Sequence, residues 1–131
     1  MAESLQGERD QFIVRVMTAA TVSRRMAFRE WIQAELNDLI VRAGTLEGAA
    51  EGEIKFQLEK LVEELRDIDS RQLRDAVRNS DEICSQVEAG VYTDCLNASE
   101  YLTEALNPFE AIVRRLLRSR DFVEALWGDG S

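Results

Sequence analysis

The stretch EIKFQLEKLVEELRDIDSRQLRDAVRNSDEICSQVEA, residues 53–89, is the part of the sequence that decides the fold class. Apolar residues recur in it every three or four positions, and the first six fall within an arc of about 120° on a helix. The stripe consists of Ile54, Leu58, Leu61, Val62, Leu65 and Ile68, and continues with slight drift through Leu73, Ala76, Ile83 and Val87. The spacing predicts a long amphipathic helix. Asp69 either restarts this helix as a cap, with Gln72 completing a capping box, or lies within an unbroken helix.

Glycines mark the turns on either side of this stretch. Three segments without glycine, 8–43, 53–89 and 91–127, are rich in the helix formers Ala, Leu, Glu and Arg. Gly44 and Gly90 suit helix ends, and Thr45 and Thr93 suit the caps of the helices that follow, with Asp94 in the first turn. With turns at 44–52 and 90–92, residue i is expected opposite roughly residue 94 − i on the next segment.

The last segment keeps one apolar face, which Asn107-Pro108 interrupts. Because a residue before proline avoids the α region, we expect one helix to end near Leu106 and another to begin at Pro108, capped by Asn107. The face comprises Cys95, Ala98, Leu102, Leu106, Phe109, Val113, Leu116 and Val123.

The first segment has two apolar faces. One comprises Phe12, Ile13, Val16, Met17, Ala20, Ala27 and Trp31, and the other comprises Ile32, Leu36, Leu39, Ile40 and Ala43. Either this helix is kinked near Thr21, or it is covered on two sides.

These patterns predict an all-α protein, an elongated antiparallel helical bundle of three long helical segments. The third segment is expected to be broken at Pro108. We expect residues 1–131 to form a single helical domain with flexible ends at 1–7 and 128–131.

The chain is also expected to be cytoplasmic and to have no membrane partner. No apolar run approaches the roughly 20 residues of a membrane span, and the polar N-terminus lacks a secretory signal. In the cytosol Cys84 and Cys95 are expected as reduced, buried thiols, with a disulfide between them as the alternative.

The chain has 131 residues, a net charge of −9 and no histidine. Missing histidine argues against Ser-His and Cys-His catalysis and against His-containing zinc sites, and no glycine-rich phosphate loop is present. We therefore expect no enzyme activity, no cofactor and no metal. Residues 44–69 hold three basic and eight acidic groups, a net −5, so the total charge does not exclude a phosphate-bearing partner.

The function predicted first is a non-enzymatic, protein-binding regulator or inhibitor that acts through helical surfaces as a homodimer. Aromatic residues off the apolar stripes, especially beside arginine, are typical of interfaces. The predicted partner-binding residues are Phe28, Phe56, Arg24, Arg25 and Arg29.

The alternative is a helical protein that binds duplex DNA or RNA through a belt of arginines in the middle of the bundle. Arginine clusters neutralise backbone phosphates, although intrahelical ion pairs with nearby acids also explain such spacing. The residues for this function are Arg71, Arg74, Arg78, Arg114, Arg115 and Arg118.

Overall fold

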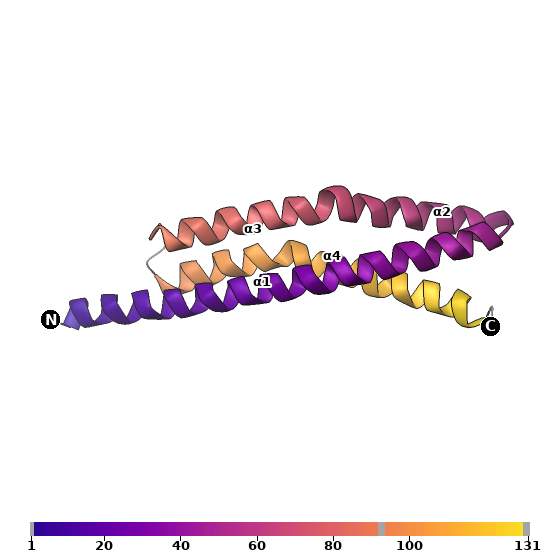
Figure 1. Cartoon of the computed structure of the whole chain (residues 1–131). Helices are drawn as coiled ribbons and strands as arrows, with labels where there is room; N and C mark the ends of the chain where they lie inside the picture. The colour runs from indigo at the N-terminus through magenta and orange to yellow at the C-terminus, as the bar shows by residue number, and fades with distance from the viewer. Residues whose placement is uncertain (1, 92–93, 130–131) are drawn as a thin grey trace. The chain divides into compact units, whose positions relative to one another are not determined.

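The computed structural model describes residues 2–91 and 94–129, and these residues form four α-helices and one π-helix (Figure 1). In chain order the elements are α1 (Ala2–Ala49), α2 (Gly52–Asp67), the π-helix η1 (Ile68–Gln72), α3 (Leu73–Glu88) and α4 (Cys95–Asp129). The described ranges contain no strand. Since α2, η1 and α3 follow one another without a gap, the chain has three long helical segments. This confirms the predicted all-α bundle.

The helices contribute to two compact units. Unit 1 comprises Met1–Phe28 and Asp75–Glu110, and unit 2 comprises Arg29–Arg74 and Ala111–Ser131. The predicted flexible ends fall partly on helix, because residues 2–7 belong to α1 and residues 128–129 to α4. Residues 1, 130 and 131 lie outside the described residues.

Within unit 1, α1 runs antiparallel to α3 and parallel to α4. Val14 shares a cluster with Val87, and Arg25, further along α1, pairs with Asp81, earlier in α3. Along α1 and α4 the residue numbers of contacting pairs increase together, because Asp10 contacts Cys95 and Phe28 contacts Phe109.

Unit 2 has the same helix directions. Gln33 Nε2 donates a hydrogen bond to Asp69 Oδ1 at 3.1 Å, and Leu46 lines a small cavity with Leu58, so α1 is antiparallel to α2. The residue numbers of the pair Gln33 and Asp69 sum to 102, whereas the turn expected at 44–52 predicted pairs that sum to about 94. The predicted pairing is therefore wrong by about two helical turns, because α1 is longer than expected.

The turns explain this longer α1. Gly44 lies inside α1, which ends at Ala49, and Thr45 donates its hydroxyl to Val41 O within the helix instead of capping a new one. The reversal comes at Gly52, whose φ of 68° favours glycine, and α2 begins there. Leu46 and Ala49, in the last turns of α1, line a small cavity with Leu58 of α2 in unit 2.

The second turn follows the prediction more closely. Gly90, just after α3, has a φ of 82°, which favours glycine. The predicted cap Thr93 lies outside the described residues. Asp94 Oδ1 accepts a hydrogen bond from Leu96 N at 2.8 Å, so this carboxylate caps the start of α4.

The π-helix between α2 and α3 keeps one face of this segment in phase. Buried residues are spaced three or four apart up to Ile68, and then buried Leu73 follows five positions after Ile68. A π turn holds one more residue than an α turn, so Leu73 returns to the buried face. Asp69 therefore neither restarts nor caps a helix, and it accepts the hydrogen bond from Gln33 instead.

Neither outer segment is interrupted. α4 continues through Pro108, so the break expected there is replaced by one helix of 35 residues. Proline inside a helix costs about 3 kcal/mol. Burial of a large apolar side chain contributes roughly 1.5–3 kcal/mol, and Leu106, Phe109 and Ile112 are all buried around the proline. α1 is likewise a single helix, with no interruption near Thr21.

The buried face of α1 follows a single line along the whole helix. In its second half the line contains the expected Ile32, Leu36, Leu39 and Ala43. In its first half the line passes through Val14, Thr18 and Thr21. The face predicted there is mostly exposed, although Met17 and Trp31 are half-buried and Met17 packs against the core cluster of unit 1. Within the described part of unit 1, α1 is therefore not covered on two sides.

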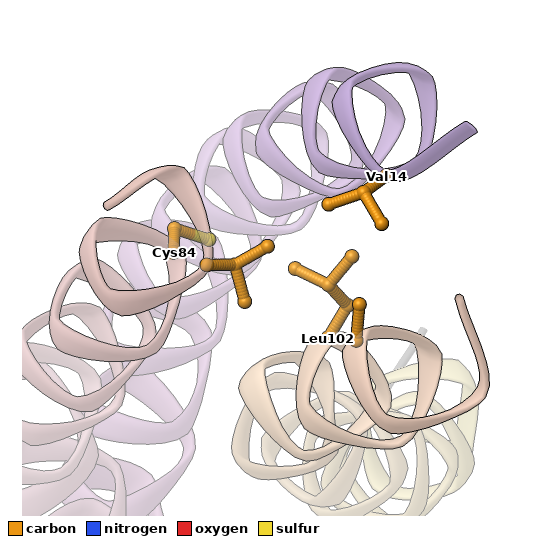
Figure 2. Packing of buried hydrophobic residues seen from close by; sticks show 5 residues of the cluster. Val14, Cys84 and Leu102 are labelled. Atoms are coloured by element: carbon orange, nitrogen blue, oxygen red, sulfur yellow. The ribbon is translucent and has the colours of Figure 1, made fainter. Parts of the chain in front are cut away.

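The two units have different cores. Buried residues of unit 1 include three alanines, Ser80, Thr18 and Thr21, and a cluster of Val14, Cys84, Val87, Ala98 and Leu102 (Figure 2). The two threonine hydroxyls donate to carbonyls four residues earlier, Val14 O and Met17 O. Unit 2 instead buries mostly leucine, isoleucine and valine. Since stabilisation follows apolar area, unit 1 has the weaker core.

Deleting Ser70, an exposed residue of η1, tests the role of the π turn. The deletion places Leu73 four positions after Ile68 instead of five, which suits a regular α-helix, so we expect a folded protein with cooperative urea unfolding. Deleting exposed Asn79 in α3 is the matched control. It rotates the following residues by about 100° and should abolish cooperative unfolding. Equal damage from both deletions would contradict this role for η1.

Candidate functional site

The first candidate site is an exposed apolar face on α1 in unit 1, which we call the outer face. At 100° per residue it lies opposite the line of Val14, Thr18 and Thr21. It comprises Phe12, Val16, Ala19, Ala20, Ser23, Met26 and Ala27, all exposed. Phe12 is 61%, Val16 53% and Met26 55% exposed. The hydrophobic effect favours covering such a contiguous apolar strip.

Phe28, the centre of the predicted interface cluster, is half-buried in unit 1. Its ring stacks on buried Phe109 with centroids 6.3 Å apart and an interplanar angle of 8°. The Arg24 guanidinium lies 6.0 Å from the centroid of the Phe28 ring. Arg25 forms an ion pair with Asp81 of α3. These contacts give Phe28, Arg24 and Arg25 roles within unit 1.

Phe56 and Arg29 are exposed in unit 2. Phe56 is 55% exposed, as its position off the stripe predicted, and the Lys60 ammonium lies 4.6 Å from its ring centroid. Neither residue belongs to the outer face of unit 1, so the structure does not bring the five predicted partner-binding residues together in one unit.

The arginines of the predicted belt also fall in both units. Arg78 is in unit 1, while Arg71, Arg74, Arg114, Arg115 and Arg118 are in unit 2. Arg71 donates two hydrogen bonds, 2.8 and 2.9 Å long, to Asp67 one turn earlier. For this arginine the structure therefore shows an intrahelical ion pair, which was the alternative to phosphate binding.

A polar network surrounds η1 in unit 2. Asp67 accepts hydrogen bonds from Arg71 and from Gln72 Nε2, the latter at 2.7 Å. The Arg71 guanidinium is the main cause, followed by Gln72, that lowers the pKa of Asp67 to about 2. Gln72 Oε1 in turn accepts from Arg115 of α4 at 2.6 Å. The π turn thus connects an acidic side chain of α2 with an arginine of α4.

Beside this network, α2 and α4 form a groove with a volume of about 450 Å³. Its lining includes Lys60, Leu61, Glu64, Arg115, Arg118 and Phe122. Two of these, Arg115 and Arg118, belong to the predicted nucleic-acid set. Sequence reasoning missed Lys60 and Phe122, although the spacing of Arg115, Arg118 and Phe122 places them on one helix flank.

Both cysteines are free thiols in unit 1. Burial raises the pKa of Cys84, and the Cys95 thiol donates to Asp10 Oδ1 at 3.2 Å, which raises the pKa of Cys95. Raised pKa values favour the unreactive thiol over the thiolate nucleophile. The described residues contain no group of three or more metal-ligating side chains. They also contain no helix with the length and apolar character needed to cross a membrane.

Comparison with protein-family models, with characterised proteins and with solved structures finds no match to this chain. The candidate sites are therefore argued from their own geometry.

Arg71→Gln should raise the pKa of Asp67 toward its ordinary 3.8, because it removes the main hydrogen-bond donor. An NMR titration of the Asp67 carboxyl carbon measures this shift. A carboxyl with a lowered pKa stabilises the fold above its unfolded pKa, and this contribution is lost as the pH falls from 3.8 through about 2. Asp67→Asn should therefore flatten the dependence of stability on pH in that window only. An unchanged Asp67 titration in the Arg71 variant would contradict the assignment.

The aromatic residues should differ in their effect on stability. Phe109→Ala removes a fully buried ring and should lower the free energy of unfolding by about 3–5 kcal/mol. Phe28→Ala should cost at least the roughly 0.5–1.5 kcal/mol of the stacked pair. Exposed Phe56→Ala should change stability by no more than about 0.5 kcal/mol. Urea denaturation measures all three. If Phe28→Ala left the free energy of unfolding unchanged, the stacking on Phe109 would not stabilise the fold, and Phe28 would again be a candidate for partner binding.

Proposed function

We propose that this chain is a non-enzymatic, protein-binding regulator or inhibitor that forms a homodimer through the outer face of α1 in unit 1. The observation that carries the proposal is the exposure of Phe12, Val16 and Met26 on the side of α1 away from the core. The weaker core of unit 1 adds support, because a partner that covers this face would stabilise the unit by mass action.

The order of residue sizes on the outer face suits a second copy of the same helix. Alanines and a serine lie in the middle of the face, with Phe12 and Val16 at one end and Met26 at the other. In an antiparallel pair related by a two-fold axis, each bulky end meets the opposite end of the partner. The small central residues let the two helices approach closely.

The non-enzymatic and cytoplasmic parts of the proposal have separate support. The chain has no histidine to activate a nucleophile, and both thiols have raised pKa values, which disfavour the thiolate. Free cysteines fit the reducing cytosol.

Val16→Asp tests the dimer. The substitution places a charge on the face of both copies, and burying an unpaired charge is costly, so we expect dimerisation to weaken at least about tenfold, or about 1.4 kcal/mol. Sedimentation velocity over a range of concentrations measures the change. Val41→Asp is the matched control, because Val41 is also on α1, is 67% exposed and belongs to unit 2.

A strict monomer at high concentration would overturn the homodimer, and a Val16→Asp protein that dimerises like the wild type would overturn the chosen face. Far-ultraviolet circular dichroism of both variants checks that the helices are retained.

Nucleic-acid binding is the second candidate function, and the groove of unit 2 is the observation that favours it. Arg115 and Arg118 of the predicted set lie there beside Lys60. Arg71 is held by Asp67 and is less available to a phosphate. The geometry therefore supports a local site in unit 2 more than a belt of six arginines around a duplex.

A further inference from the structure

We propose that the groove between α2 and α4 binds a nucleotide, with the phosphate held by Lys60, Arg115 and Arg118 and the base against Phe122. This inference rests on the second candidate function, and it names the residues and the ligand chemistry. It is independent of the outer face of α1, which lies in unit 1.

Positively charged side chains outnumber carboxylates in the lining of the groove. Lys60, Arg115 and Arg118 line it together with a single carboxylate, that of Glu64. Among the described residues, no carboxylate forms a salt bridge with any of the three cations. Three adjacent positive charges without ion-pair partners are unexpected in a chain of net charge −9. They define an anion site, because multiple positive groups around a cleft raise the local concentration of anions.

Two of these cations, Arg115 and Lys60, are held in place by neighbouring side chains. Arg115 donates a hydrogen bond to Gln72 Oε1, and Lys60 lies over the Phe56 ring, so neutral groups hold both side chains. The charge of Arg115 also acts on the Asp67 carboxylate, whose pKa it helps to lower. The Gln72 contact in particular positions Arg115 before a ligand arrives, which lowers the entropic cost of binding.

The apolar part of the lining sets the class of ligand. Half-buried Phe122 of α4 and Leu61 of α2 line the groove, and aromatic side chains bind the faces of nucleobases. A volume of about 450 Å³ falls in the range of small-molecule sites. Phosphate and base together identify a nucleotide, either free or as an unpaired residue of a single strand, because a base inside a duplex does not expose its face.

The experiment uses the whole chain and four probes, which are AMP, inorganic phosphate, a fluorescent ten-nucleotide single strand and a duplex of the same sequence. Calorimetry and fluorescence anisotropy at low salt measure binding. We expect AMP and the single strand to bind, and the duplex to bind more weakly than the strand. The logarithm of the strand affinity should fall with the logarithm of salt by about 0.7 per phosphate contact.

Three variants locate the site. Arg118→Gln should weaken AMP and the single strand at least tenfold, while Arg66→Gln, at an exposed arginine of α2 outside the groove lining, should change neither. Phe122→Leu keeps an apolar side chain, so it should weaken AMP and the single strand but leave inorganic phosphate unchanged. Binding of AMP without the strand identifies a free nucleotide as the ligand, and tighter binding of the strand identifies a single-stranded nucleic acid.

Failure of the groove and failure of the second candidate function give different results. No binding of any probe overturns both. Strand or duplex binding that survives Arg118→Gln but falls with Arg74→Gln and Arg78→Gln overturns the groove and keeps nucleic-acid binding. Equal losses in Arg118→Gln and Arg66→Gln show binding to net charge alone and overturn the groove. Thermal unfolding of each variant confirms that the bundle is retained.

Discussion

Each long helical segment has to keep one face on the core over its whole length, and the remaining features of the structure depend on this constraint. On α1 the constraint selects one line of positions from Val14 to Ala43. An α-helix returns to the same side every 3.6 residues, so a long stripe drifts unless its spacing is corrected. In the segment of α2 and α3 the correction is η1, where Leu73 follows five positions after Ile68. The same turn positions Gln72 to receive Arg115, and it thereby shapes the groove.

The composition of the buried line differs between the two units. In unit 2 the line is built from large aliphatic residues, and its exposed surface holds a groove with charged walls. In unit 1 alanine, threonine and serine occupy many buried positions, while Phe12, Val16 and Met26 are exposed. Less apolar area is therefore buried inside unit 1, and more of it remains exposed.

Sequence reasoning predicted the outer segments only in part. The face of α4 was predicted closely, except that Ala105 and Ile112 are also buried, while the expected Cys95 and Val113 are only half-buried. The signal for η1 was present as the drift of the stripe beyond Ile68, but drift alone did not distinguish a π turn from a restart of the helix. On α1 both apolar faces were recognised. The line through Ile32, Leu36 and Leu39 extends backwards through Phe28, Thr21 and Thr18 at the same spacing, and following it would have identified the outer face as exposed.

The sequence by itself determined the helical class, the three segments and the second turn, because propensity, apolar period and a glycine with positive φ act over a few neighbouring residues. Tertiary structure decided which of two apolar faces of α1 is buried, where α1 ends, and that α4 continues through Pro108. In each case a local free-energy cost in the helix is set against the free energy gained when its side chains are buried against another helix. Only the packed partners, such as Phe28 on Phe109, show which of the two is larger.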